Sequence, residues 1–260
     1  KFLKDPHDLE YEKTFDPFLL LSKKRYVGML YEMDPNKGKR KEMGIVLKRR
    51  DNAPIVKDVY GGLIDILMKE NDIEAAIAFT RACLKDIVGE KYPLEKLIIS
   101  KKLSSFYKNP ESIAHKVLAD RMGKRDPGNK PAVGSRVPFV YIQTKGKVKL
   151  QGDRVESPDY VRENNIRPDY GFYITNQIMK PVQQVFALIL EQIPEYKRKV
   201  RQLNIRIESL KEKYKGDDKK RDDKIDALKN KEVKKLIFDD ALRQATNIKT
   251  GQKSIKSFFN

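Results

Sequence analysis

The sequence is poor in the residues that build disulfide frameworks, zinc sites and many catalytic centres. Its 260 residues include one cysteine, two histidines and no tryptophan. The single Cys83 excludes an internal disulfide framework and a structural zinc site made of cysteines. With only His7 and His115, a histidine-rich metal site and two-histidine catalysis are excluded as well. Because Cys83 lies in an apolar helical pattern, we expect its side chain to be buried.

Long apolar runs are also missing. No apolar stretch approaches the roughly 18–20 residues that span a bilayer, and residues 1–10 lack the apolar core of a signal peptide. These absences predict a soluble intracellular protein without a membrane partner. Since the first residue is not methionine, we expect the chain to be part of a longer protein.

Common catalytic motifs are absent too. The sequence has no Gly-rich phosphate loop, no G-x-S-x-G and no H-E-x-x-H. The acidic group around Asp5 and Asp8 lies in a Pro-containing terminal segment and lacks the strand-borne Asp-x-Asp of a two-metal site. We therefore predict no catalytic residue and no metal ligand in this chain.

What the sequence has is positive charge. Lys and Arg number 55 against 37 Asp and Glu, which gives a net charge of +18 and a pI near 9.7. This balance favours a polyanionic partner, with nucleic acid as the first candidate. The alternative is a solvated, lysine-rich surface.

The hydrophobic pattern predicts an α+β fold that begins with strands. We expect a short apolar strand at 18–22, a half-buried strand at 26–32 and a returning strand at 43–47. A basic turn fills residues 34–41. We interpret it as a charged hairpin tip, and a localisation signal is the alternative.

Residues 55–125 are predicted to be mainly helical. Apolar residues recur at helical intervals in two stretches that separate before Asp72, the expected N-cap of the second helix. A strand is expected at 97–103. A further helix is expected to begin with Asn109 as cap and Pro110 at its first position.

Residues 126–190 are predicted to contain loops and short strands. A strand is expected at 136–142, where Pro138 indicates an edge. The last helix of this region is expected to follow Pro181.

The segment 191–260 differs from the rest. It holds 20 basic and 12 acidic residues, a net charge of +8. A stripe with the spacing of a helical seam precedes Gly216, and it consists of Tyr196, Val200, Leu203, Ile207, Leu210 and Tyr214. We predict an antiparallel helical hairpin, with one long frayed helix as the alternative.

Basic and aromatic residues meet at 23–26. Strand alternation places Lys24 and Tyr26 on one face and Lys23 and Arg25 on the other. Lysines can hold phosphate oxygens while a tyrosine hydroxyl reaches a base or sugar. A solvated strand end would have a similar sequence.

A second basic group, Lys48-Arg49-Arg50, precedes Asp51. It suits the same chemistry. An internal Arg–Asp ion pair that fixes the turn is the alternative.

Six ordered segments resemble B-family, delta-like DNA polymerases. The first carries Lys23-Lys24-Arg25-Tyr26 and resembles the palm segment that follows the second catalytic aspartate motif. The second resembles the passage from palm to thumb, and the others resemble thumb segments. They are residues 15–28, 48–51, 97–101, 115–122, 133–141 and 173–177.

The resemblance implies a DNA-directed DNA polymerase in which the primer 3′-hydroxyl attacks the α-phosphate of a dNTP, helped by two Mg²⁺ ions. The aspartates that hold Mg²⁺ are expected upstream of Lys1, so this chain alone should be inactive. It implies the end of the palm at 1–54 and the thumb at 55–190. Beyond the resemblance, we expect a basic helical hairpin at 191–246 and a tail at 247–260. The hairpin could contact DNA or a partner, and a solvated extension of the thumb is the alternative.

The resemblance and the charge together predict contacts with primer–template DNA. The predicted DNA-binding residues are Lys23, Lys24, Arg25, Tyr26, Lys48, Arg49, Arg50, Lys101, Lys102, Arg121, Lys124, Arg125 and Arg136. Cellular delta-type enzymes continue into two cysteine-rich modules. This chain has no cysteine after Cys83, so a polymerase of a large DNA virus is the better match. Its location, in the host nucleus or in a cytoplasmic viral factory, stays open.

The C-terminal residues fit the Q-x-x-I-x-x-F-F pattern of peptides that bind a PCNA-like sliding clamp. A helical turn would present Ile255, Phe258 and Phe259 as a hydrophobic plug, with Gln252 at the rim of the pocket. A tail that docks on its own thumb is the alternative. For the chain as a whole, the alternatives are a non-catalytic, clamp-bound DNA-binding module and one chain of a split polymerase.

Overall fold

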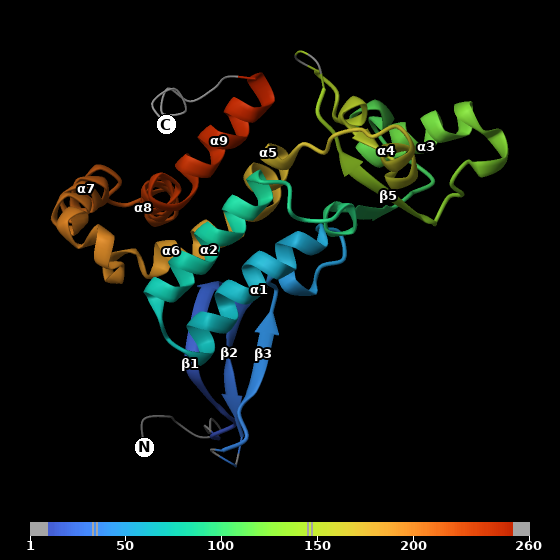
Figure 1. Cartoon of the computed structure of the whole chain (residues 1–260). Helices are drawn as coiled ribbons and strands as arrows, with labels where there is room; N and C mark the ends of the chain where they lie inside the picture. Colours follow the sequence, from blue (N-terminus) through green and yellow to red (C-terminus); the bar gives the residue numbers. More distant parts are fainter. Residues whose placement is uncertain (1–9, 33, 35, 145, 147, 252–260) are drawn as a thin grey trace.

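Two small antiparallel sheets flank a body of helices (Figure 1). The computed structural model describes residues 10–251 except 33, 35, 145 and 147. The first sheet has the order β1-β2-β3, with β1 at Thr14–Ser22, β2 at Arg25–Tyr31 and β3 at Lys39–Met43. The second has the order β4-β5-β6, with β4 at Ile99–Lys102, β5 at Arg136–Tyr141 and β6 at Val155–Glu156.

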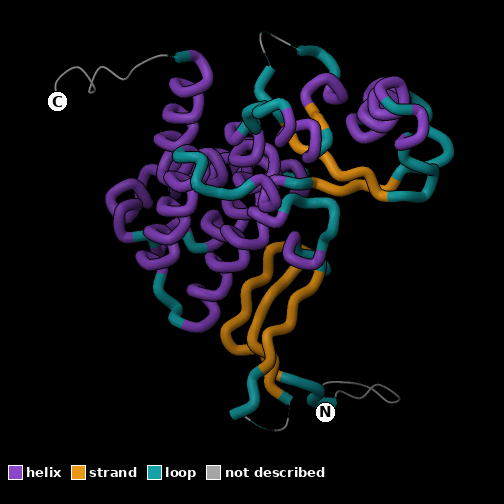
Figure 2. The backbone as a smooth tube through the Cα atoms, turned by 45° about the vertical axis from the view of Figure 1, so that its right-hand side comes forward, coloured by secondary structure: helices purple, strands orange, loops and turns teal. Residues whose placement is uncertain are grey.

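The helices form the central body and extend into the lobe that holds the second sheet (Figure 2). No helix among the described residues is long and apolar enough to cross a membrane. The α-helices are α1 Pro54–Lys69, α2 Ile73–Val88, α3 Ala114–Arg125, α4 Pro158–Glu163, α5 Tyr170–Phe172, α6 Met179–Leu188, α7 Val200–Lys213, α8 Asp218–Val233 and α9 Asp239–Thr250.

The first sheet confirms the predicted hairpin but corrects its third strand. β1 and β2 pair in antiparallel fashion, and Ser22 lies opposite Arg25. β3 ends at Met43, where the prediction had its strand begin. The reason is Gly44, whose φ of +63° turns the chain away from the strand, and a 3₁₀ turn follows at Val46–Lys48.

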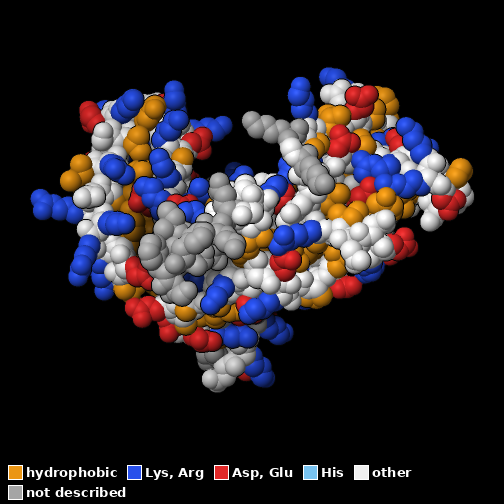
Figure 3. All heavy atoms as spheres, turned by 45° about the horizontal axis from the view of Figure 1, so that its top comes forward, with side chains coloured by type: hydrophobic (Ala, Val, Ile, Leu, Met, Phe, Trp, Pro, Cys, Tyr) orange, Lys and Arg blue, Asp and Glu red, His pale blue; other side chains and the backbone are white. Residues whose placement is uncertain are grey.

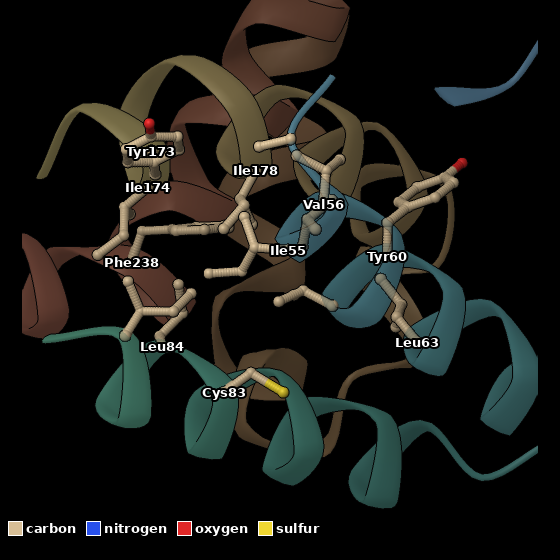
Figure 4. Close-up of a cluster of buried hydrophobic side chains, with 14 of the residues drawn as sticks. Ile55, Val56, Tyr60, Leu63, Cys83, Leu84, Tyr173, Ile174, Ile178 and Phe238 are labelled. Carbon is tan, nitrogen blue, oxygen red and sulfur yellow. The ribbon is translucent and has the colours of Figure 1, made fainter. Parts of the chain in front are cut away.

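The two amphipathic helices α1 and α2 are confirmed, and they hold the main core. The Asp72 carboxylate accepts a hydrogen bond from the Ala75 amide at 2.9 Å, as expected of an N-cap. Tyr60 of α1 and Leu84 of α2 are fully buried. Cys83 is buried as predicted, and Phe238 from the C-terminal region completes the cluster (Figure 4).

Two predicted helix starts were wrong. Asn109 makes no capping bond, and Pro110–Ser112 is a separate 3₁₀ turn before α3. The last helix of this region starts at Tyr170 instead of after Pro181, because α5, a π-helical segment at Tyr173–Ile178 and α6 are continuous. The widened π turn allows Pro181 to lie inside the helix.

The C-terminal segment forms α7 and, after a turn, α8 and α9, which a π-helical segment at Lys234–Phe238 joins. The single long helix is therefore excluded. Gly216, with φ of +92°, lies in the turn between α7 and α8, and Asp217 caps α8 by accepting from the Lys220 amide at 3.0 Å. α8 packs on α6, and α9 packs on α2. The helices of this segment therefore continue the central body.

Candidate nucleic-acid interface

One face of the β1–β3 sheet is turned away from the helices. Strand register aligns Leu20 with Tyr26 and Tyr26 with Met43, and places Phe18 opposite Gly28. Phe18, Leu20 and Met43 are 46%, 55% and 45% exposed. The opposite face carries the fully buried Val27 and packs toward the core. We call the exposed side the outer face.

The Tyr26 ring is fixed by other aromatic rings on the outer face. Its centroid lies 5.7 Å from that of Phe15 and 5.5 Å from that of Phe18. Gly28 permits this packing, because a Cβ there would lie 3.0 Å from each of the two phenyl rings and 2.9 Å from the Pro17 carbonyl oxygen. Tyr26 is thus held as part of a rigid aromatic cluster.

Exposed lysines lie on the same face of the sheet and in the adjoining turn. Lys23 and Lys24 form the β1–β2 turn, with Lys24 at φ of +62°, so they do not belong to a continuous strand as the alternation argument assumed. Lys39 and Lys41 of β3 lie opposite Leu30 and Gly28, on the outer face. Both are exposed. We call these four residues the outer-face lysines.

Lys39 and Lys41 are residues that the sequence analysis missed as binding candidates. It assigned both to a turn, although their spacing of two, continued by Met43, is the signal of a strand that shows one face to solvent. Their side chains add positive charge to the face of the sheet that carries Tyr26.

Arg25 has an internal partner, whereas Lys23 and Lys24 have no ion-pair partner among the described side chains. Its guanidinium donates to the Gln184 side-chain oxygen of α6 at 3.1 Å. Burial raises the pKa of the Tyr60 phenol to about 12, and the nearby positive charge of Arg25 opposes that rise. Arg25 therefore fastens the hairpin to the helical body.

A second basic group lies where the segment after β3 meets the second sheet. The Arg136 guanidinium donates to the Arg50 carbonyl at 3.3 Å and to the Ser100 hydroxyl at 3.1 Å. Lys102 lies directly opposite Arg136. Two cations at this position repel each other, so the pair favours an anion. β5 is the central strand of its sheet, so the edge predicted from Pro138 was wrong. The proline is tolerated there because β6 is short and pairs only with Val140 and Tyr141.

The other residues of this group are exposed. Arg49 and Arg50 form no ion pair with Asp51 among the described side chains, which removes that alternative. The side chain of Lys48 lies outside the described residues. Lys101 is exposed on β4. Burial is the main cause of the lowered pKa of His115, and the positive charge of Lys101 lowers that pKa further.

Arg121 and Arg125 of α3 have partners inside the lobe. Both donate to the Glu156 carboxylate at 2.8 Å, and Arg121 also donates to the carbonyls of Val155 and Gly152. Burial alone would raise the pKa of Glu156, but the bonds from the two arginines hold it below its usual range. We therefore assign both arginines to internal packing. Lys124 on the same helix is exposed.

Two further predictions concern metal and the clamp. Within the part of the chain that the structure describes, no group of three or more His, Cys, Asp or Glu side chains could hold a metal ion. Gln252, Ile255, Phe258 and Phe259 lie outside the described residues.

Comparison with known proteins decides the family. A sequence model of DNA polymerase family B matches residues 1–189. The chain belongs to this family.

The family B chain is similar to viral and cellular polymerases. It is 52% identical, over its whole length, to the DNA polymerase of Pyramimonas orientalis virus, of which it covers 22%. Over 73% of its length it is 38% identical to the DNA polymerase delta catalytic subunit of Caenorhabditis elegans, of which it covers 18%. The chain thus spans about a fifth of these relatives.

A solved structure supports the fold. The family B DNA polymerase of the archaeon Pyrobaculum calidifontis aligns with a TM-score of 0.50 at 23% identity, over 65% of this chain and 21% of the other. The mixed α and β fold is therefore shared with a family B polymerase fragment.

Proposed function

We propose that this chain grips primer–template DNA in a DNA-directed DNA polymerase. The observation that carries the proposal is the packed Tyr26 aromatic cluster on the same face as the outer-face lysines. In this proposal residues 1–54 end the palm and 55–190 form the thumb. The aspartates that hold Mg²⁺ for transfer of a nucleotide from dNTP to the primer 3′-hydroxyl belong to other parts of the polymerase.

The chemistry of the outer face suits a duplex backbone. Lysine ammonium groups bind phosphate oxygens of any sequence and release counterions. The Tyr26 ring is a fixed apolar surface with one polar tip, which can contact a sugar or base edge. The basic group at Arg49, Arg50, Lys102 and Arg136 supplies a second backbone contact.

Salt dependence of DNA binding tests this proposal. We expect Lys24→Gln, Lys39→Gln and Lys41→Gln together to lower the slope of log K against log salt by about 2–3, since each lost phosphate contact accounts for about 0.9. The measurement is fluorescence anisotropy of the 260-residue chain with a primer–template duplex.

The matched control removes three lysines that already have carboxylate partners. Lys91, Lys96 and Lys229 pair with Asp86, Asp58 and Glu191. Replacing these three lysines by Gln removes the same net charge as the first triple variant. It should change the slope of log K against log salt by less than about 1. Equal slopes in the two triple variants would contradict a specific role for the outer face.

We also propose that the C-terminal tail tethers the polymerase to a sliding clamp. The support is the Q-x-x-I-x-x-F-F sequence of Gln252–Phe259. In the complete polymerase, removal of residues 252–260 should abolish clamp-stimulated processivity and leave distributive synthesis intact, because the tether makes no contact with the primer terminus. Primer extension with and without clamp measures both. Equal loss of both would argue against a tether.

A further inference from the structure

The segment between α6 and α7 displays an unusual density of unneutralised charge. Lys197, Arg198, Lys199 and Arg201 are four cations within five residues, and all are exposed. We call them the 197–201 cluster. None forms an ion pair with a described side chain, and the cluster lies outside residues 1–189, which match the family model.

The cluster sits on a well-anchored backbone. A 3₁₀ turn at Pro194–Lys199 leads into α7, and the buried side chains of Tyr196 and Leu203 fix the two elements to the core. Since these anchors occupy the inner side, the four cations are presented on the outer side. Their backbone positions are set before any ligand arrives.

Nearby carboxylates are engaged elsewhere. Glu195 holds the Arg81 guanidinium through two bonds of 2.8 Å. Glu208 pairs with Lys211 at 2.8 Å, and Glu232 pairs with Lys235 at 2.8 Å. The first turn of α7 has no acidic residue. The four cations therefore repel one another without internal compensation.

This arrangement does not serve the stability of the helix. Cations next to the start of a helix face the positive end of its dipole, which costs a few tenths of a kcal/mol each or more. A solvated surface designed for stability would place acidic residues there.

We propose that the 197–201 cluster is a second binding surface for the phosphate backbone of duplex DNA. α7 lies on the side of the helical body opposite the lobe with α3 and α4 (Figure 1). Lys and Arg side chains are exposed on this side of the molecule and also on the opposite lobe (Figure 3). The cluster would lengthen the duplex that the polymerase holds. The inference rests on the proposed DNA grip and adds to it a contact outside the family match.

The test compares two quadruple variants of the full chain. The first carries Lys197→Gln, Arg198→Gln, Lys199→Gln and Arg201→Gln. The control carries Gln at four cations of the same region that pair with carboxylates three residues away, which are Lys211, Lys215, Arg221 and Arg243. Both lose four charges.

We expect the first variant to lower the slope of log K against log salt by about 3–4 on a long non-specific duplex, and the control by less than about 1. The loss should shrink as the duplex is shortened, because a short duplex cannot reach both surfaces. Circular dichroism confirms that both variants fold.

Equal slopes for the two variants would overturn the inference while leaving the outer-face result intact. An unchanged slope together with lost binding to phosphatidylserine vesicles would also overturn it, since the cluster would then serve a membrane surface. Absence of DNA binding by the unaltered chain would overturn both proposals.

Discussion

Replacement of Glu156 by alanine is expected to lower the free energy of unfolding by about 2–4 kcal/mol. The carboxylate is 4% exposed and neutralises both Arg121 and Arg125. Its loss removes the carboxylate that both guanidinium groups share, and Arg121 keeps only the carbonyls of Val155 and Gly152 and the more distant Asp153 at 3.5 Å. Because these groups are 24% and 38% exposed, water offsets part of the 3–5 kcal/mol typical of a fully buried pair. Urea denaturation of the chain measures the change.

Glu208→Ala is the control, because Glu208 pairs with Lys211 on the surface of α7. It should change stability by about 0.5 kcal/mol or less. The effect of Glu156→Ala should shrink in acid. A carboxyl whose pKa is lowered by folding stabilises the folded state at pH values above its unfolded pKa of 4.5. This contribution is lost as the pH falls through the folded pKa. A loss equal to that of Glu208→Ala at pH 7 would contradict a structural role.

The ion pairs between Glu156 and the two arginines show where sequence-based prediction reaches its limit. A basic residue in a sequence looks equally suited to DNA whether or not it has a partner. Glu156 lies more than thirty residues from Arg121 and Arg125, so only the folded chain shows that both arginines are engaged. Arg25 is similar, because its partner Gln184 is 159 positions away.

Local patterns were predicted more successfully. The periodicity of α1 and α2 and the cap at Asp72 depend on neighbours within a few residues, and both are confirmed. β3 was displaced because its exposed lysines resemble turn residues, and only pairing with β2 defines it as a strand. The helix that contains Pro181 includes a π-helical turn, which no pattern in the sequence predicts.

The outer face depends on two glycines that hold its geometry. A Cβ at Gly44 would lie 2.3 Å from the Lys24 carbonyl oxygen. Gly28 gives the Phe15 and Phe18 rings their place beside Tyr26. The turn that carries Lys24 and the ring of Tyr26 are thus positioned by the backbone beneath them, which is why we expect substitutions of Tyr26 to act through geometry as well as through its hydroxyl.

In the complete polymerase, Tyr26→Ala is expected to lower kcat/KM for primer extension by about 10–100-fold. Removal of the ring opens a gap beside Phe15 and Phe18, so the duplex end loses its fixed contact and the primer terminus is misplaced. Tyr26→Phe keeps the ring and should cost less than about 10-fold, the worth of one hydrogen bond. Single-turnover extension at low dNTP measures both.

Separate measurement of the Kd for DNA and of the extension rate of bound primer distinguishes positioning from binding. If Tyr26 only adds affinity, Tyr26→Ala should raise the Kd for DNA and leave extension of bound primer unchanged. If it positions the primer, extension of bound primer should slow, and proofreading, where the polymerase has it, should gain on synthesis. Tyr11→Ala is the matched control, since Tyr11 is exposed and lies ahead of β1. Extension by Tyr26→Ala at the rate of Tyr11→Ala would refute the primer grip.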